Sequence, residues 1–266
     1  MKQPTIFLPH GGGPCFFMDP PPEDPARWVA LEAYLRGLPQ DLPARPDAIL
    51  LVSAHWEAPR PTVLAASRPA LLFDYYNFPP HTYRLTYPAP GAPDLAKRVR
   101  ALLAEAGIDS DEELERGFDH GVFVPMKVAF PDADVSILQL SLQRGLDPAT
   151  HIAIGKALAP LRDENIVIIG SGLSFHNLAA RGDSRLDAPA EAFDRWLSDA
   201  LCGRTGEGRE AALDSWSEAP GARASHPREE HLLPLMVAAG AAHDDPCRQM
   251  FSGRIWGKAV SAFQFG

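Results

Sequence analysis

The stretch Ala48-Ile-Leu-Leu-Val-Ser-Ala-His-Trp56 decides the fold class. An apolar run of strand-forming residues ends there in a small-residue pair, a histidine and a tryptophan. Such a run predicts a strand buried on both faces, as in a parallel sheet. Because open α/β sheets bind ligands outside the carboxyl ends of their strands, His55 is a candidate site residue.

Two other apolar segments end in a similar way. Thr5–Leu8 precedes Pro9, His10 and three glycines, and Asn165–Ile169 precedes Gly-Ser-Gly and then His176. Strands are also expected at 135–141 and, as a final edge strand, at 255–263. Helices are expected at 25–38, 94–107, 124–130, 151–161, 190–201 and from His226 to Gly240. Strands that alternate with helices predict one α/β domain over residues 1–266, with a mostly parallel central sheet covered by helices on both faces.

Composition narrows the choice of partners and setting. The net charge of -9 argues against nucleic acid or an anionic membrane surface as a partner. No apolar run approaches the roughly 18 residues of a membrane span, so no membrane segment is expected. The three cysteines, Cys15, Cys202 and Cys247, predict no disulfide framework and no CxxC metal pair. A cytoplasmic setting is therefore the default, and a homo-oligomer is left open.

Each histidine, taken alone, is more often a hydrogen-bonded structural residue than a metal ligand. That interpretation is kept for His81, His151 and His243, with His151 expected to be solvated at a helix start. His226 precedes a proline, where it would either cap the next helix or line a pocket. His231 falls in the expected first turn of that helix, beside acidic residues.

His10, His55 and His176 differ from these because each follows an apolar strand and a small-residue turn. The carboxyl ends of parallel strands emerge on one edge of the sheet, so the three side chains are expected to meet there. Two strand-end imidazoles and a third ligand from a helix would leave coordination positions free, as a catalytic metal requires. No HExxH spacing is present, and the sequence leaves iron and zinc both open.

Several motifs, in order along nearly the whole chain, resemble the class III extradiol ring-cleavage dioxygenases. They are Leu8-Pro-His-Gly-Gly-Gly-Pro14, Ser53-Ala-His-Trp56, the aromatic loop 74–91, Asp119-His-Gly121 with Pro125, Ser171-Gly-Leu-Ser-Phe-His-Asn177 and Glu230-His-Leu-Leu-Pro-Leu235. Within that superfamily the chain looks most like the DOPA 4,5-dioxygenase-type branch.

The resemblance implies one Fe(II) or Zn(II) ion per chain, with His10 and His55 as the leading ligands. The third ligand position falls on His231, where ring-cleaving relatives of known mechanism have a glutamate. The site is then all-imidazole, and the native metal is left open. Glu230 is the neighbouring alternative, but on a helix it would point about 100° away from His231.

The same resemblance implies roles for residues around the ion. His176 corresponds to the catalytic base, or to a fourth metal ligand, and His120 to a pocket residue that hydrogen-bonds a ring hydroxyl or oxygen. Tyr76 and Tyr83 of the aromatic loop would wall the pocket and stack on a planar ring. His226, together with Arg228, is expected to contact a substrate carboxylate.

The expected activity is therefore extradiol cleavage, in which O2 opens the ring of a catechol-type substrate outside its two hydroxyls. Which catechol is used does not follow from the sequence. One alternative is a zinc hydrolase of a small amide or ester, in which the same histidines activate water. An interaction module without enzymatic activity is a second alternative, and the complete histidine set and the aromatic loop argue against it.

Overall fold

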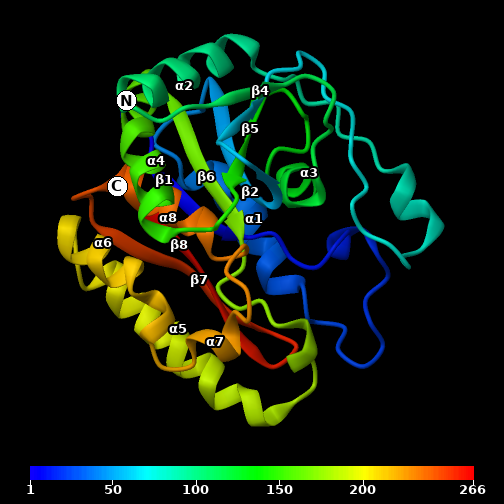
Figure 1. Ribbon diagram of the computed structural model, residues 1–266. Helices are drawn as coiled ribbons and strands as arrows, with labels where there is room; N and C mark the ends of the chain where they lie inside the picture. Colours follow the sequence, from blue (N-terminus) through cyan, green and yellow to red (C-terminus); the bar gives the residue numbers. More distant parts are fainter.

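The computed structural model describes residues 1–266, and an eight-stranded sheet in the order β4-β3-β5-β2-β6-β1-β8-β7 forms its centre. The strands are β1 (Thr5–Pro9), β2 (Ala48–Ala58), β3 (Thr62–Leu64), β4 (Asp111–Glu113), β5 (Ser136–Gln143), β6 (Ile166–Gly172), β7 (Cys247–Ile255) and β8 (Lys258–Phe265). The neighbours β5, β2, β6 and β1 run parallel, as Figure 1 shows. Antiparallel pairs extend this core on both sides, β8 against β1 and β3 against β5.

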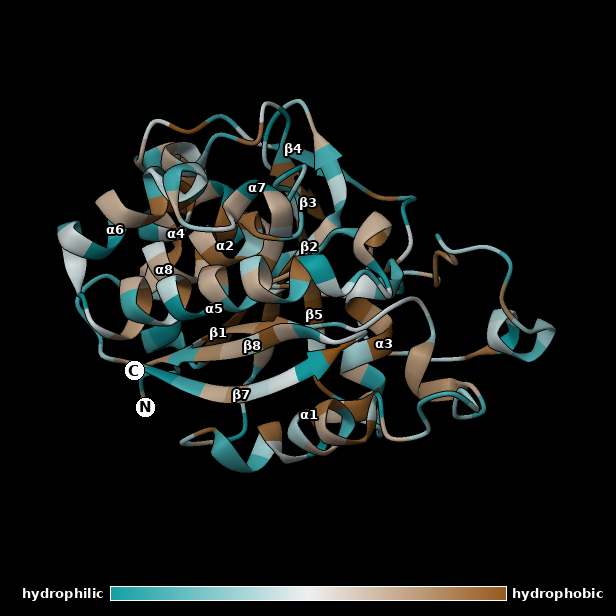
Figure 2. Cartoon of the chain, turned by 90° about the horizontal axis from the view of Figure 1, so that it is seen from below, coloured by the Kyte–Doolittle hydropathy of each residue, from teal (hydrophilic) through white to brown (hydrophobic).

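Helices cover both faces of the sheet. They are α1 (Val29–Asp41), α2 (Pro93–Glu105), α3 (His120–Ala129), α4 (Pro148–Leu158), α5 (Asp187–Cys202), α6 (Gly206–Asp214), α7 (Ala222–Ser225) and α8 (Leu233–Ala242). Figure 2 shows α1 and α3 on one side of the sheet and α2, α4, α5 and α8 on the other. The predicted single-domain α/β architecture is confirmed. None of the helices has the length and apolar character needed to cross a membrane.

The apolar run in β2 is continuous because both of its faces are buried. Leu50 and Val52 point into the core beneath α2, α4 and α8, whereas Ile49 and Leu51 point into the core beneath α1 and α3. All four side chains are fully buried. Alternate residues of a strand face opposite sides of a sheet, so an uninterrupted apolar run is what a central parallel strand requires.

The C-terminal hairpin differs from the sequence expectation. The strand predicted at 255–263 is β8, which begins at Lys258 and lies inside the sheet between β1 and β7. The edge strand is β7, which the sequence did not predict. Its side chains are mostly half-buried or exposed, so it carries no apolar run. The segment 214–225, before the final helix, contains the short helix α7 and buries Trp216.

The cysteine and His151 interpretations also need correction. The structure pairs Cys202 at the end of α5 with Cys247 at the start of β7, and their Cα atoms lie 4.6 Å apart. A disulfide requires only that two cysteines lie close together in the folded chain, and a count of cysteines cannot reveal this.

His151 is buried rather than solvated. Its Nδ1 faces the Asp147 carbonyl at 2.8 Å, and its Nε2 accepts a backbone N–H at 3.1 Å.

Candidate metal centre

Three of the predicted ligands meet at the carboxyl edge of the parallel strands. His10 directly follows β1, His55 lies near the end of β2, and His231 lies just before α8. One ring nitrogen of each lies within 4.8 Å of the others. The Nε2 atoms of His10 and His55 are 3.1 Å apart. The strand-end argument predicted that His10 and His55 meet at this edge, and the family resemblance added His231.

A break in the strand ladder presents His55 to this edge. The pairing of β2 with β6 ends at Ser53, and the pairing with β5 is interrupted between Val52 and Glu57. The backbone N–H of His55 donates to the Ser53 hydroxyl at 3.2 Å. A bulge of this kind re-aims a side chain at the sheet edge, and here it turns an imidazole away from the ladder.

Two glycines allow close approach beneath the histidines. A Cβ at Gly172 would lie 2.1 Å from the carbonyl oxygen of His231, and the N–H of Leu173 donates to that same oxygen at 3.0 Å. A Cβ at Gly121 would lie 2.5 Å from the Ser53 hydroxyl oxygen. The absence of side chains therefore lets the backbone before α8 and the start of α3 close around the site.

Hydrogen bonds assign the tautomer of His10. The hydroxyl of Ser171 donates its proton to the carbonyl oxygen of Gly121, so its oxygen accepts the 3.2 Å bond from Nδ1 of His10. A neutral imidazole carries one N–H, so Nε2 of His10 presents a lone pair toward His55.

Two partly buried carboxylates impose the same tautomer on other rings. Glu230 Oε1 lies 2.8 Å from Nδ1 of His231 and 3.2 Å from Nδ1 of His176. These two rings stack with their centroids 3.4 Å apart, so both Nε2 atoms point away from the shared carboxylate. Asp74 likewise lies 2.8 Å from Nδ1 of His120. Carboxylate–imidazole pairs of this kind orient metal-ligating histidines and raise their basicity.

The electrostatics keep the three ligands uncharged. Burial, and secondarily the neighbouring histidines, hold the pKa values of His10 and His231 well below the usual range. Burial also lowers the pKa of His55 to about 3. Burial opposes ionisation of Glu230, but the hydrogen bond from His176, a backbone hydrogen bond and the charges of His176 and Arg228 together outweigh it, so the pKa of this carboxyl is lowered. Neutral imidazoles backed by an ionised carboxylate are the form that binds a cation.

Glu230 does not point away from His231, as a helical geometry would require. The helix begins only at Leu233, with Pro234 in its first turn, and residues 227–232 form bends and turns. Glu230 is therefore free to turn toward its neighbour and supports two imidazoles at once. Its other oxygen, Oε2, lies 3.5 Å from Nη1 of Arg228.

The histidines open into a cavity of about 290 Å³. Its lining residues are His10, Gly11, Gly12, Gly13, His55, Asp74, Tyr75, Tyr76, Phe78, His120, Leu173, His176, Leu178, Arg181, His231 and Trp256. The structure thus brings His120 and His176 to the same cavity as the three candidate ligands. Tyr76 lines its mouth and is 80% exposed.

Three predicted substrate-contacting residues, Tyr83, His226 and Arg228, lie outside this cavity. Tyr83 stands behind the wall, where its hydroxyl oxygen accepts the N–H of Phe78 at 3.3 Å. His226 is fully buried between the rings of Phe193 and Trp216, and its Nε2 faces the Ser174 carbonyl at 2.9 Å. Arg228 pairs with Glu57 at 2.7 Å. The structure therefore gives all three residues supporting positions.

Of four further residues that shape the site, the sequence indicated only Glu230, as an alternative metal ligand. Asp74 and Glu230 hold the imidazoles, while Arg181 and Trp256 line the mouth. Asp74 stands at the head of the aromatic loop and Glu230 beside His231, so their positions offered a signal. Arg181 and Trp256 are 75 positions apart and meet only in the folded chain.

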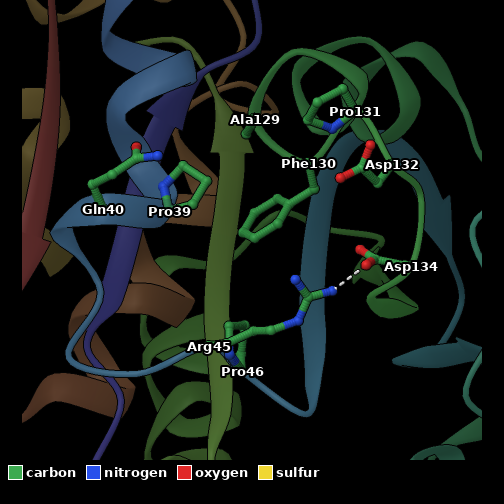
Figure 3. Close-up of a pocket in the computed structure, with 9 residues that line it drawn as sticks. All are labelled: Pro39, Gln40, Arg45, Pro46, Ala129, Phe130, Pro131, Asp132 and Asp134. Atoms are coloured by element: carbon green, nitrogen blue, oxygen red, sulfur yellow. Dashed lines mark ion pairs between the residues drawn. The ribbon is translucent and has the colours of Figure 1, made fainter.

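A second cavity of similar size, about 280 Å³, lies between the end of α1 and the segment after α3 (Figure 3). It adjoins the amino ends of β2 and β5, the edge of the sheet opposite to the histidines. Its one ion pair joins Arg45 to Asp134 at 2.5 Å, and no histidine lines it. The three groups of side chains that lie close enough together to hold a metal ion are all at the carboxyl edge.

Comparison with known proteins agrees with this geometry. Residues 4–261 match the family described as the catalytic LigB subunit of aromatic ring-opening dioxygenase. The chain belongs to this family. The predicted resemblance is thereby confirmed, and the protein is an aromatic ring-opening dioxygenase, an oxidoreductase of a metal-dependent family.

Individual relatives support the same assignment. A 4,5-DOPA dioxygenase extradiol of Portulaca grandiflora is 39% identical over 89% of this chain and 85% of its own length. A protein of the same name from Escherichia coli K12 is 35% identical over 90% and 85%. The solved structure of an uncharacterised protein from Escherichia coli K12 superimposes with a TM-score of 0.80 and 31% identity over the whole of both chains.

Proposed function

We propose that this LigB-family enzyme cleaves a catechol-type substrate with O2 at a single Fe(II) ion held by His10, His55 and His231. The observation that carries the proposal is the approach of three neutral histidines, with one ring nitrogen from each within 4.8 Å of the others. Three imidazoles also suit zinc, which binds such sites more tightly than Fe(II) does. Zinc is therefore the expected competitor in isolated protein.

The ion would supply Lewis acidity toward the two ring oxygens and a redox route between the ring and O2. The chain's own residues manage the protons. His176 donates its Nδ1–H to Glu230, so its Nε2 is free to take a proton from a ring hydroxyl. The carboxylate then stabilises the charged imidazolium. If His176 is instead a fourth ligand, its replacement will lower the metal affinity as well as the rate.

His120 is placed to fix the orientation of the substrate. Asp74 holds its Nδ1–H, so its Nε2 accepts a hydrogen bond from a hydroxyl in the cavity. Tyr75 and Phe78 form a wall whose ring centroids lie 5.3 Å apart, and Tyr76 stands at the mouth. Aromatic side chains so arranged favour a planar ring between the histidines and solvent.

The second candidate function is a zinc hydrolase of a small amide or ester. Three neutral histidines with an open cavity are also the ligand set with which zinc activates water. Membership in a ring-opening family favours the dioxygenase.

Oxygen uptake by protein loaded anaerobically with Fe(II) separates the two functions. The dioxygenase consumes one O2 per catechol and releases a yellow semialdehyde, whereas the zinc-loaded control consumes none. If the iron protein took up no oxygen with any catechol of a panel, and the zinc protein cleaved esters, the hydrolase would replace the dioxygenase.

A further inference from the structure

The tip of the β7–β8 hairpin forms part of the mouth of the histidine cavity. Trp256 and Gly257 have positive φ values of 51° and 80°, a combination typical of a tight hairpin turn. This turn places the Trp256 ring in the wall of the histidine cavity and of a neighbouring cavity of about 420 Å³. The two cavities share Gly12, Phe78, Arg181 and Trp256, so they meet at this ring.

Two arginines lie over the Trp256 ring, and they differ in their partners. Arg27, 5.9 Å from the ring centroid, forms ion pairs with Glu23 at 3.1 Å and Asp24 at 3.3 Å. Arg181 lies closer, 3.8 Å from the centroid, and its guanidinium makes no hydrogen bond or ion pair. It is the only arginine or lysine that lines the histidine cavity. A positive charge without a partner therefore stands at the cavity mouth.

The opposite end of the cavity holds the histidines, where the proposed function places the metal ion and the two ring oxygens. That end is lined by Asp74 but by no arginine or lysine. A substrate whose ring oxygens face the histidines would therefore place a negative group on its side chain at the mouth, toward Arg181.

We infer that Arg181 is the residue that binds a carboxylate on the side chain of the catechol-type substrate. The inference rests on the proposed function and adds a specificity-determining residue to it. Stacking on Trp256 fixes the plane of the guanidinium and leaves its N–H edge free for a two-point contact with a carboxylate. The neighbouring cavity provides room for the side chain beyond the ring.

A matched pair of substrates tests Arg181. The probes are 3-(3,4-dihydroxyphenyl)propionate and its methyl ester, which differ only in the charge at the end of the side chain. In the iron-loaded enzyme, Arg181→Gln should lower kcat/KM for the acid by roughly 10-fold or more, mainly through KM. The same variant should change kcat/KM for the ester by less than about twofold, because no charged contact is lost.

Arg27→Gln is the matched control, since it removes the same charge from the other arginine over the same tryptophan. It should keep kcat/KM for the acid within about threefold of wild type, because Arg27 is already paired with acidic side chains. Arg181→Lys should recover part of the loss, because it restores the charge without the planar fork. Equal losses in Arg27→Gln and Arg181→Gln, or equal losses for acid and ester, would overturn the assignment.

Anaerobic calorimetric titration of both probes into the iron-loaded protein separates this inference from the proposed function. Tenfold weaker binding of the acid to Arg181→Gln than to wild type supports the anion site even if no ring is opened. Equal affinity of the two proteins for the acid refutes it even if turnover is normal.

Discussion

Replacement of Glu230 should affect the proposed metal centre strongly, because one of its carboxylate oxygens contacts two imidazoles. Its Oε1 accepts from Nδ1 of His231 at 2.8 Å and of His176 at 3.2 Å, and its side chain is only 14% exposed. Glu230→Gln keeps the shape but removes the charge. Loss of such a partner typically weakens metal binding by about 10- to 100-fold, or about 1.4 to 2.7 kcal/mol.

Competition with a chromophoric chelator measures this loss directly for Zn(II), and anaerobically for Fe(II). The control is Glu229→Gln, which removes the same charge from the adjacent residue, whose side chain pairs with Arg223 at 2.6 Å. Because the pKa of Glu230 is lowered, its charge is constant at neutral pH, and the loss should be the same from pH 6.5 to 8.5. Equal metal affinity of the Glu230→Gln and Glu229→Gln proteins would refute the supporting role of Glu230.

Two further predictions concern packing and pH. Gly172→Ala should destabilise the fold by about 1 to 3 kcal/mol in chemical denaturation and lower the metal affinity, because the added Cβ would displace the backbone of His231. The control is Gly208→Ala, since a Cβ at Gly208 would meet no atom within 4 Å. Metal-free protein should lose stability as pH falls below about 6.5, because buried His226 has its pKa lowered to about 4 and the unfolded chain binds the proton first. The neutral His226 contributes about 3 kcal/mol to the free energy of unfolding; this contribution is fully present above the unfolded-state pKa and is lost progressively toward pH 4. An unchanged urea midpoint between pH 7.5 and pH 5 would contradict this prediction.

The residues that the sequence placed correctly are those whose positions follow from strands. His10 and His55 follow apolar runs, and parallel strands deliver their ends to one edge whatever lies between them in the chain. His231 came from the family resemblance rather than from a pattern. The helix assumed around it led to the wrong direction for Glu230, because helical residues were extended back past Pro234.

Residues in irregular segments could not be placed from the sequence. Tyr76 and Tyr83 belong to one aromatic loop, yet only Tyr76 faces the cavity, since the path of the loop is set by tertiary packing. His226 lies in a buried aromatic cluster that no local pattern indicates. Arg181 meets Trp256 only because a polar edge strand, β7, brings the hairpin tip to the cavity mouth.

The proposal that the same three histidines bind either Fe(II) or Zn(II) is tested most directly by anomalous diffraction from crystals of zinc-loaded protein, recorded at the zinc absorption edge. We predict one peak per chain, at about 2.0 to 2.1 Å from the Nε2 atoms of His10, His55 and His231. A peak bonded to the Glu230 carboxylate, a peak at an Nδ1 atom of these rings, or no peak at this edge of the sheet would contradict the proposed centre.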